Sequence, residues 1–354
     1  MIYRLLILSF LIIPIDAFSS DAISHAPLGV TADHFHKKGE WMVSLRVTNM
    51  EMKNNIFNGN SIPTKKILNQ PNPFASEIMN MGMAKMPKNL SVIPKKMTMK
   101  MVMLGAMYAP SDKVTLMGML MFDDKEMTLD THNGEMGRNY IGSFNTSSSD
   151  ISKISFSGLY NLYESEKSRW HLILGLEQGL GENSKKGIVL NPMNMKFSTT
   201  LPYGMQISDK ALRLLSGITN VTKLEDFIIG NQLVIKKIIS EKNWNFGDEF
   251  EYNLWLQGSF SKNVSYSIRL NYKDQDSIGG RDKAIMAPVQ TSNPNNYGGQ
   301  TLNLGLGINT LTDIFVGEHK DRFSIEILKP IDQDMNGLQM KDDFTILLGF
   351  QKML

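Results

Sequence analysis

The sequence predicts an all-β protein: a transmembrane antiparallel β-barrel of about twelve strands with short periplasmic turns and long extracellular loops. Three observations favour this fold. Apolar and polar residues alternate with a period of two along most of the chain. The connections between the alternating segments are short and long by turns. The first residues have the composition of an export signal.

The export signal begins with a positive charge. Arg4 precedes an apolar run over residues 5–13, and the small residues Ala17 and Ser19 follow. A charge, an apolar run too short to span a bilayer and then small residues are typical of a secretory signal peptide. We therefore expect a signal peptide at 1–20, a periplasmic N-terminal segment or lumen plug at 21–39, and a barrel over 40–354 in the outer membrane of a Gram-negative bacterium.

The alternation is clearest over residues 264–273. There Val264, Tyr266, Ile268 and Leu270 share one side of an extended strand, and polar residues occupy the other side. Strict alternation gives each strand one apolar and one polar face. Segments of about ten residues are long enough for a tilted strand to cross the hydrocarbon core, so we expect the apolar faces to contact lipid.

Connection lengths separate the two ends of the barrel. Short connections are expected at 109–113, 164–168, 223–226, 261–263 and 317–322, and long ones at 53–95, 129–146, 183–208, 240–249, 274–300 and 331–342. Short periplasmic turns and longer extracellular loops are typical of bacterial barrels, which have an even number of strands. Two expected strands, 212–219 and 227–239, alternate poorly, and Asn231 lies among apolar neighbours in the second.

Aromatic residues near the expected short turns predict an interfacial girdle. They are Trp41, Tyr108, Tyr160, Trp170, Phe260 and Phe323. The last segment also resembles the C-terminal signal of outer-membrane proteins, with Phe350 as its last aromatic residue. This resemblance implies the barrel-assembly machinery as a partner, beside the lipid bilayer.

Composition excludes several function classes. The 37 Lys and Arg residues nearly balance the 35 Asp and Glu residues, so no basic excess predicts nucleic-acid binding. The chain has no Cys, which excludes disulfides, thiol catalysis and Cys-ligated metal. No His is followed by Ser two positions along, and no Gly-x-Ser-x-Gly elbow or P-loop is present. The sequence therefore predicts no enzymatic activity and no catalytic residues.

Methionine is unusually frequent, with 25 residues. On three segments the Met residues alternate with other residues, and we expect those on the side opposite the lipid-facing residues to line the lumen: Met42, Met50, Met99, Met101, Met103, Met117, Met119 and Met121. Thioether side chains have three interpretations here. They fill an irregular lumen, they line a track for apolar solutes, or they ligate a soft ion such as Cu(I).

Charged residues on the polar sides of the strands predict a polar network in the lumen. They are Arg46, His171, Glu177, Glu251, Arg269 and Glu326. Such a set either stiffens the barrel as a lattice of ion pairs or selects solutes, and the first interpretation is favoured.

Three histidines come before the first strand. His25, His34 and His36, with Asp33 adjacent, are residue types that bind zinc or copper. An ordinary solvated or plugging segment explains the same residues, because Phe35 and Lys37 lie among them. Otherwise the sequence predicts no cofactor.

Several sequence blocks resemble the bacterial outer-membrane transporter-like family associated with the meta-pathway of phenol degradation. The blocks are 25–30 (HAPLGV), 33–42 (DHFHKKGEWM), 97–110 (MTMKMVMLGAMYAP), 115–119 (TLMGM), 284–290 (AIMAPVQ), 293–295 (NPN) and 298–300 (GGQ). The resemblance implies a barrel that passes small aromatic or apolar molecules, and it supplies no catalytic residues.

These observations predict an outer-membrane channel or transporter-like barrel for small apolar or aromatic solutes. Two alternatives are open. One is a metal-handling outer-membrane protein with His and Met ligands for copper, and the other is a structural barrel with a closed lumen.

Overall fold

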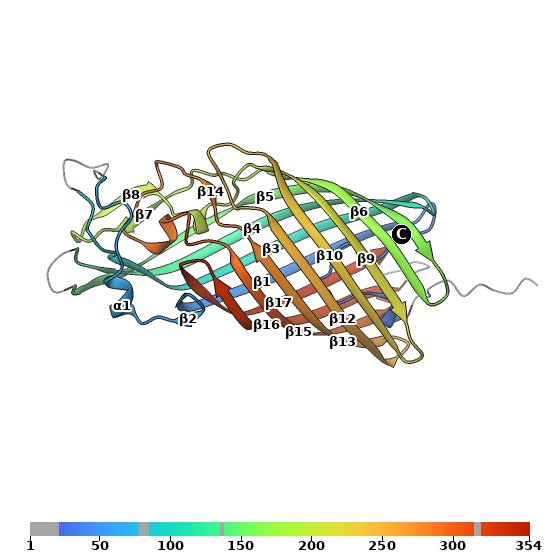
Figure 1. Cartoon of the computed structure of the whole chain (residues 1–354). Helices are drawn as coiled ribbons and strands as arrows, with labels where there is room; N and C mark the ends of the chain where they lie inside the picture. The colour runs from blue at the N-terminus through green and yellow to red at the C-terminus, as the bar shows by residue number, and fades with distance from the viewer. Residues whose placement is uncertain (1–20, 78–84, 135–137, 315–319) are drawn as a thin grey trace, which may run out of the picture.

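The computed structural model describes residues 21–77, 85–134, 138–314 and 320–354, so the expected signal peptide lies outside the described residues. Within these ranges, twelve long strands form one antiparallel sheet that closes on itself (Figure 1). Each strand pairs with the next long strand along the chain, and the last pairs with the first through contacts such as Leu45 opposite Phe350. The predicted β-barrel fold is confirmed.

The barrel strands are 12 to 25 residues long. They are β1 (Trp41–Phe57), β3 (Val92–Ser111), β4 (Val114–His132), β5 (Tyr140–Glu164), β6 (Ser168–Gly179), β9 (Leu212–Lys223), β10 (Phe227–Ser240), β12 (Glu249–Ser261), β13 (Val264–Gln275), β15 (Gly299–Thr312), β16 (Asp321–Met335) and β17 (Leu338–Met353). Both poorly alternating segments are therefore strands of the barrel, β9 and β10.

Short elements gather at one end of the barrel, which we call the long-loop end (Figure 1). They include β2 (Asn60–Ser61), α1 (Thr64–Leu68), the hairpin of β7 (Lys186–Leu190) and β8 (Lys196–Thr200), the pair β11 (Trp244–Asn245) and β14 (Gly279–Gly280), and the 3₁₀ turns η2 (Tyr203–Met205) and η3 (Gln290–Ser292). No helix in the described part of the chain is long and apolar enough to cross a membrane.

The two faces of each strand differ in the way that the alternation predicts. On β13, Ser267 and Arg269 are buried inside the barrel, whereas Ile268 and Leu270 are exposed on the outer surface. The outer surface is thus apolar over a continuous belt, which matches the hydrocarbon core of a bilayer.

The belt ends at one level on neighbouring strands. Val102 and Phe122 are paired outward-facing apolar residues of β3 and β4. Two positions further toward the long-loop end, the paired outward residues are Lys100 and Asp124. Because charged side chains on a lipid face are costly, the membrane boundary lies between these two rows.

Aromatic residues mark the other edge of the belt, at the end where strands are joined by short turns, which we call the short-turn end. Trp41 stacks on Tyr108 with ring centroids 4.4 Å apart, and Phe323 lies 5.1 Å from Phe350. Trp41 and Tyr160 are exposed on the outer surface. Rings of this kind favour the boundary between lipid and water.

Asn231 faces outward on β10 close to the short-turn end. Its Nδ2 donates a hydrogen bond of 3.2 Å to Oδ1 of Asn220, which lies directly opposite on β9. The two amides therefore satisfy each other at the level of the aromatic girdle, which explains the polar residue in this segment.

Two expected loops are wrong. Most of 129–146 is strand, because β4 continues to His132 and β5 begins at Tyr140. Beyond the membrane boundary the outward residues of β4 are polar, such as Glu126 and Thr128, so this part of the sheet is compatible with water. The loop expected at 331–342 is a two-residue turn, Asn336–Gly337, in which Gly337 has φ +61°. Gly adopts this left-handed conformation without a steric cost, so the strands continue on both sides of it.

Candidate functional site

The N-terminal segment (residues 21–39) lies inside the barrel. Its 3₁₀ turn η1 (Ala22–Ser24) begins at the short-turn end, where the Ala22 N–H donates to Lys262 O (3.0 Å) and the Ser265 hydroxyl donates to Ala22 O (2.9 Å). The segment leaves at the same end, where the Gly39 N–H donates to Ala109 O (2.8 Å). It therefore forms a loop that enters the lumen and returns.

Inward-facing side chains of the wall hold the backbone of this segment. Donors from five strands reach its carbonyl oxygens: Arg169 to Ser24 (3.2 Å), Gln257 to His25, Arg322 to Ala26 (2.7 Å), Arg46 to Val30 (3.3 Å), Gln232 to Thr31 (2.8 Å) and His171 to Ala32 (2.8 Å). Because these strands come from different sides of the barrel, the segment is fixed across the lumen rather than against one wall.

Gly29 makes a close approach to the wall. Its N–H donates to Oε2 of Glu326 (2.6 Å), and a Cβ at this position would lie 2.0 Å from Nη2 of Arg269. The neighbouring Leu28 is buried against Gly349 of β17. Two adjacent residues of the segment thus contact different parts of the wall. Gly29 lies beside the Arg269–Glu326 ion pair, and Leu28 fills the space that Gly349 leaves.

The predicted polar residues belong to three separate groups. Arg269 pairs with Glu326 (2.7 Å) and donates to Asn253, and Glu251 joins this group by accepting from Asn271 (2.8 Å). Glu177 instead lies 3.4 Å from Lys153 and 3.5 Å from Lys236.

Arg46 and His171 are in neither of these groups, because they hold carbonyl oxygens of the N-terminal segment. The structure therefore divides the single polar network expected from the sequence into two clusters of ion pairs and a set of wall residues that donate to the carbonyl oxygens of the segment. We call this set the seat: Arg46, Arg169, His171, Gln232, Gln257 and Arg322. Glu326 links its ion-pair cluster to the segment through the Gly29 N–H.

Methionines face one another across three neighbouring strands. On β1, β3 and β4, Met42, Met107 and Met117 form one row of directly opposed residues. The other opposed pairs are Met103 with Met121, Met50 with Met99, Met52 with Met97, and Met97 with Met127. Met101 lies opposite Thr48 and Met119 opposite Gly105.

The row nearest the short-turn end packs against the N-terminal segment. Met42, Met107 and Met117 form an apolar cluster with Ala32 of the segment and with Leu159 of β5. A small cavity of about 20 Å³ beside this cluster is lined by Met103, Met119 and Asp33, among others. The thioethers therefore make up part of the surface against which the segment rests.

The histidines of the segment are gathered in its interior. His34 lies between the other two, with ring centroids 5.2 Å from His25 and 4.8 Å from His36. Asp33 Oδ1 is 2.9 Å from His34 Nδ1, and His36 Nδ1 is 3.4 Å from the Glu40 carboxylate. Burial and then the nearby Arg322 charge lower the pKa of His25 well below its ordinary value. Burial, followed by the effect of His34, lowers the pKa of His36 to about 3, so both rings are neutral at pH 7.

A second region of interest is an apolar cavity of about 70 Å³ at the long-loop end. Its walls come from β4, β5, the β7–β8 hairpin and the 286–289 segment, and they include Met127, Leu129, Phe144, Val189, Phe197 and Val289. Met127 and Leu129 also belong to the apolar cluster that joins the barrel wall to η2 through Leu201 and Met205.

A polar layer separates this cavity from the methionines below it. On β4 the inward residues between Met121 and Met127 are Asp123 and Lys125. Lys125 Nζ donates to Gln206 O (2.7 Å) and Gly204 O (3.3 Å), so the loop that carries η2 is anchored in the lumen.

Several residues of the seat were missed in the sequence. Arg169, Arg322 and Gln232 lie on the inward side of their strands, next to the outward residues Trp170, Phe323 and Leu233. The alternation therefore predicts that these three side chains face the lumen. It gives no sign that their partner is the backbone of a distant segment.

Comparisons with known proteins identify the fold. No protein-family model and no curated protein sequence matches this chain. An outer-membrane channel from Pseudomonas putida F1 superposes with a TM-score of 0.55 and 11% identity, covering 92% of this chain and 99% of the channel. A FadL homologue of Pseudomonas aeruginosa gives a TM-score of 0.41 and 6% identity, with 89% and 90% covered. The monoaromatic hydrocarbon channel CymD gives 0.37 and 8%, with 90% and 89% covered.

The Pseudomonas putida channel and the apolar outer belt agree on one fold. This chain is an outer-membrane β-barrel. The association with phenol degradation stays a prediction.

Proposed function

We propose that this protein is an outer-membrane channel that takes up small solutes with an apolar group. The apolar cavity at the long-loop end carries the proposal, because it offers a binding place for such a group on the side where solutes arrive. The Pseudomonas putida protein with the similar fold is described as a channel, which agrees with this function.

The volume of the cavity limits the solute. A dry cavity of about 150 Å³ lined by aliphatic and aromatic side chains binds benzene. The cavity here is about 70 Å³, so it holds a short alkyl group or the edge of one ring. Long acyl chains do not fit unless the β7–β8 hairpin moves.

The residues along the route below the cavity further limit the kind of solute that the channel suits. A solute that leaves the cavity meets the polar layer of Asp123 and Lys125, then the methionines, and finally the N-terminal segment. Methionine side chains adapt their shape to different apolar groups. We infer that the channel suits small solutes that have an apolar body and one polar group, such as phenols or short alcohols.

The test compares two adjacent residues of β7. Val189 lines the cavity, whereas Ile188 points away from it and is exposed. Binding of phenol and of 1-hexanol to the full mature protein is measured by isothermal titration calorimetry, and uptake by liposome swelling. Val189→Asn is expected to weaken binding about 10-fold, because a buried amide without a partner costs about 1–2 kcal/mol.

Ile188→Asn is the matched control and is expected to leave both binding and uptake unchanged. Equal binding by the two variants would move the solute site away from the cavity. Neither binding nor swelling with any probe would support the closed structural barrel instead.

A further inference from the structure

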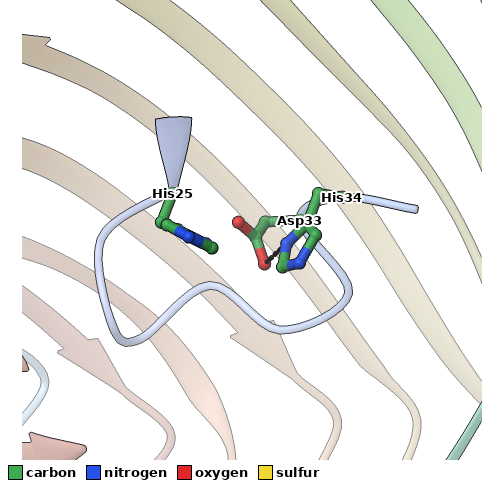
Figure 2. A group of neighbouring side chains, drawn as sticks. All are labelled: His25, Asp33 and His34. Atoms are coloured by element: carbon green, nitrogen blue, oxygen red, sulfur yellow. Dashed lines mark ion pairs between the residues drawn. The ribbon is translucent and has the colours of Figure 1, made fainter. Parts of the chain in front are cut away.

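His25, Asp33 and His34 bring three metal-binding side chains together inside the barrel. One potential ligand atom from each lies within 4.8 Å of the other two. Figure 2 shows that the N-terminal segment bends back on itself, so that His25 on one arm faces Asp33 and His34 on the other. The fold of the segment, and not its sequence spacing, creates this cluster.

The hydrogen-bonding capacity of the cluster is only partly used. Asp33 Oδ2 accepts from the Ala26 N–H (3.0 Å), and Asp33 Oδ1 is 2.9 Å from His34 Nδ1 (Figure 2). Within the described residues, the buried atoms His25 Nδ1, His34 Nδ1 and His34 Nε2 have no hydrogen-bond partner. Buried polar atoms without partners are rare in native proteins and often indicate a ligand or ion.

The contact between Asp33 and His34 has the spacing of two ligands of one ion. Nitrogen and oxygen ligands lie about 2.0–2.2 Å from a zinc ion, so two ligand atoms bound to the same ion are about 3 Å apart. Here Asp33 Oδ1 lies 2.9 Å from His34 Nδ1, and neither ring nitrogen of His34 has a hydrogen-bond partner within the described residues. His34 is 7% exposed and Asp33 is 3% exposed, so the site is screened from bulk water.

The donor types and the surrounding charges limit the kind of ion. Imidazole suits zinc and copper, whereas Ca²⁺ and Mg²⁺ prefer oxygen ligands. Arg169 and Arg322 donate to the carbonyls of Ser24 and Ala26 nearby, and their positive charges disfavour an ion that is held by charge alone. An ion that bonds strongly to imidazole nitrogen fits this environment best.

We propose that His25, Asp33 and His34 bind one ion of the Zn²⁺ or Cu²⁺ class, and that this ion fastens the N-terminal segment inside the barrel. The ion joins residue 25 to residues 33 and 34 and so closes the loop between them. That loop contains Gly29, Val30 and Ala32, which contact Glu326, Arg46 and His171 of the wall. Binding of the ion therefore stabilises the conformation that fits the seat.

Metal retention tests the site directly. Tag-free mature protein is stripped with EDTA, incubated with Zn²⁺ or Cu²⁺, passed through a desalting column and measured by mass spectrometry for metal per barrel. One equivalent of zinc or copper is expected for the unchanged chain, and less than one tenth of that for His25→Gln and for His34→Gln. The slower gel migration of heated barrels shows whether each variant is folded.

His132→Gln is the matched control, because His132 is a buried histidine at the end of β4 outside the segment. It is expected to retain a full equivalent. Failure of the unchanged protein to retain either ion, or equal retention by His25→Gln, His34→Gln and His132→Gln, would overturn the site.

Protease accessibility tests the fastening. The unchanged protein in detergent micelles is expected to become several-fold more resistant to trypsin at Lys37 and Lys38 when the ion is added, and His34→Gln is expected to show no such change. Full metal retention without any change in cleavage would refute the fastening while keeping the site. Neither measurement involves a solute, so both are independent of the channel proposal.

Discussion

Gly29 is the residue at which the N-terminal segment depends most directly on the wall. Its N–H bonds to Glu326, and its missing side chain leaves space for the Arg269 guanidinium. A methyl group at this position would displace Arg269 from the ion pair with Glu326, which is buried.

Gly29→Ala is therefore expected to loosen the segment. The overpacking is expected to cost about 1–3 kcal/mol of the free energy that holds the segment in place. The measurement is the rate of trypsin cleavage at Lys37 and Lys38 in the folded protein, which should rise.

Gly118→Ala serves as the control for this substitution. A Cβ at Gly118 on β4 would meet no atom within 4 Å. Cleavage in this variant should stay at the level of the unchanged protein. A Gly29→Ala variant that is cleaved no faster than Gly118→Ala would contradict the close fit.

At the scale of single elements, β3 shows how the membrane boundary is encoded. Leu104 faces outward within the apolar belt and is 53% exposed, whereas Thr98 lies beyond Lys100 and is paired with Glu51 and Glu126. The same strand therefore offers one position in lipid and one in water.

An arginine should be tolerated at only one of these two positions. Leu104→Arg is expected to lower the free energy of unfolding in lipid vesicles by about 2–4 kcal/mol, and Thr98→Arg by about 0–1 kcal/mol. Urea titration of vesicle-folded protein, followed by tryptophan fluorescence, measures both values. Similar losses for the two variants would mean that the boundary lies elsewhere.

The methionines of β4 permit a separate test of their role. Replacement of Met117, Met119 and Met121 by Leu keeps the apolar volume and removes the sulfur. Each change is expected to cost less than about 1.5 kcal/mol. Because the proposed ion is bound by the N-terminal segment, copper and zinc retention should be unchanged in the triple variant. Loss of copper alone would assign a thioether ligand and revive the interpretation of the stripes as Cu(I) ligands.

The strands were predictable because each has one face in lipid and one in the lumen. Where β4 and β5 leave the membrane, this contrast is lost. The sequence therefore predicts a loop at 129–146, and this prediction is wrong. At 331–342 the polar residues Asp332 and Asp334 favour a loop, although both belong to a strand that continues to Met335. The turn itself could be located, because Asn336 and Gly337 are typical turn residues. The alternation of apolar and polar residues thus predicts a strand only where one face contacts lipid and the other face contacts the lumen along the whole length of the strand.

At the scale of the whole molecule, the N-terminal segment crosses the lumen, and we expect it to limit conduction. Removal of residues 22–36 leaves the twelve-strand ladder of the described chain intact, since none of these residues belongs to it. The polar side chains of the seat would then contact water. Planar-bilayer recordings are expected to show a several-fold larger single-channel conductance for the truncated protein.

A synthetic peptide with the sequence of residues 21–39 controls for indirect effects of the truncation. Added at the short-turn side, it should reduce the conductance again. Equal currents with and without residues 22–36 would mean that the segment does not obstruct the lumen.

The candidate site was predictable in its chemistry but not in its arrangement. The histidines of the segment were recognised from their residue type. The approach of His25 to Asp33 depends on a bend of the segment that the Ala26 N–H and the Asp33 carboxylate close. The seat formed by Arg169, Gln232 and Arg322 depends on contacts between residues more than a hundred positions apart along the chain. No short-range pattern contains that information, because the donors belong to strands that meet the segment only when the barrel closes.

The seat also makes the number and order of the strands a condition for holding the N-terminal segment. The segment precedes β1, and its contacts include Arg322 of β16 and Gly349 of β17, the last two strands. Its contacts therefore join strands from both ends of the described chain, and all of them form only when the barrel is closed. A barrel in which one of these strands is skipped or paired out of order would leave carbonyl oxygens of the segment without donors, so the segment favours a ring of twelve strands over smaller rings.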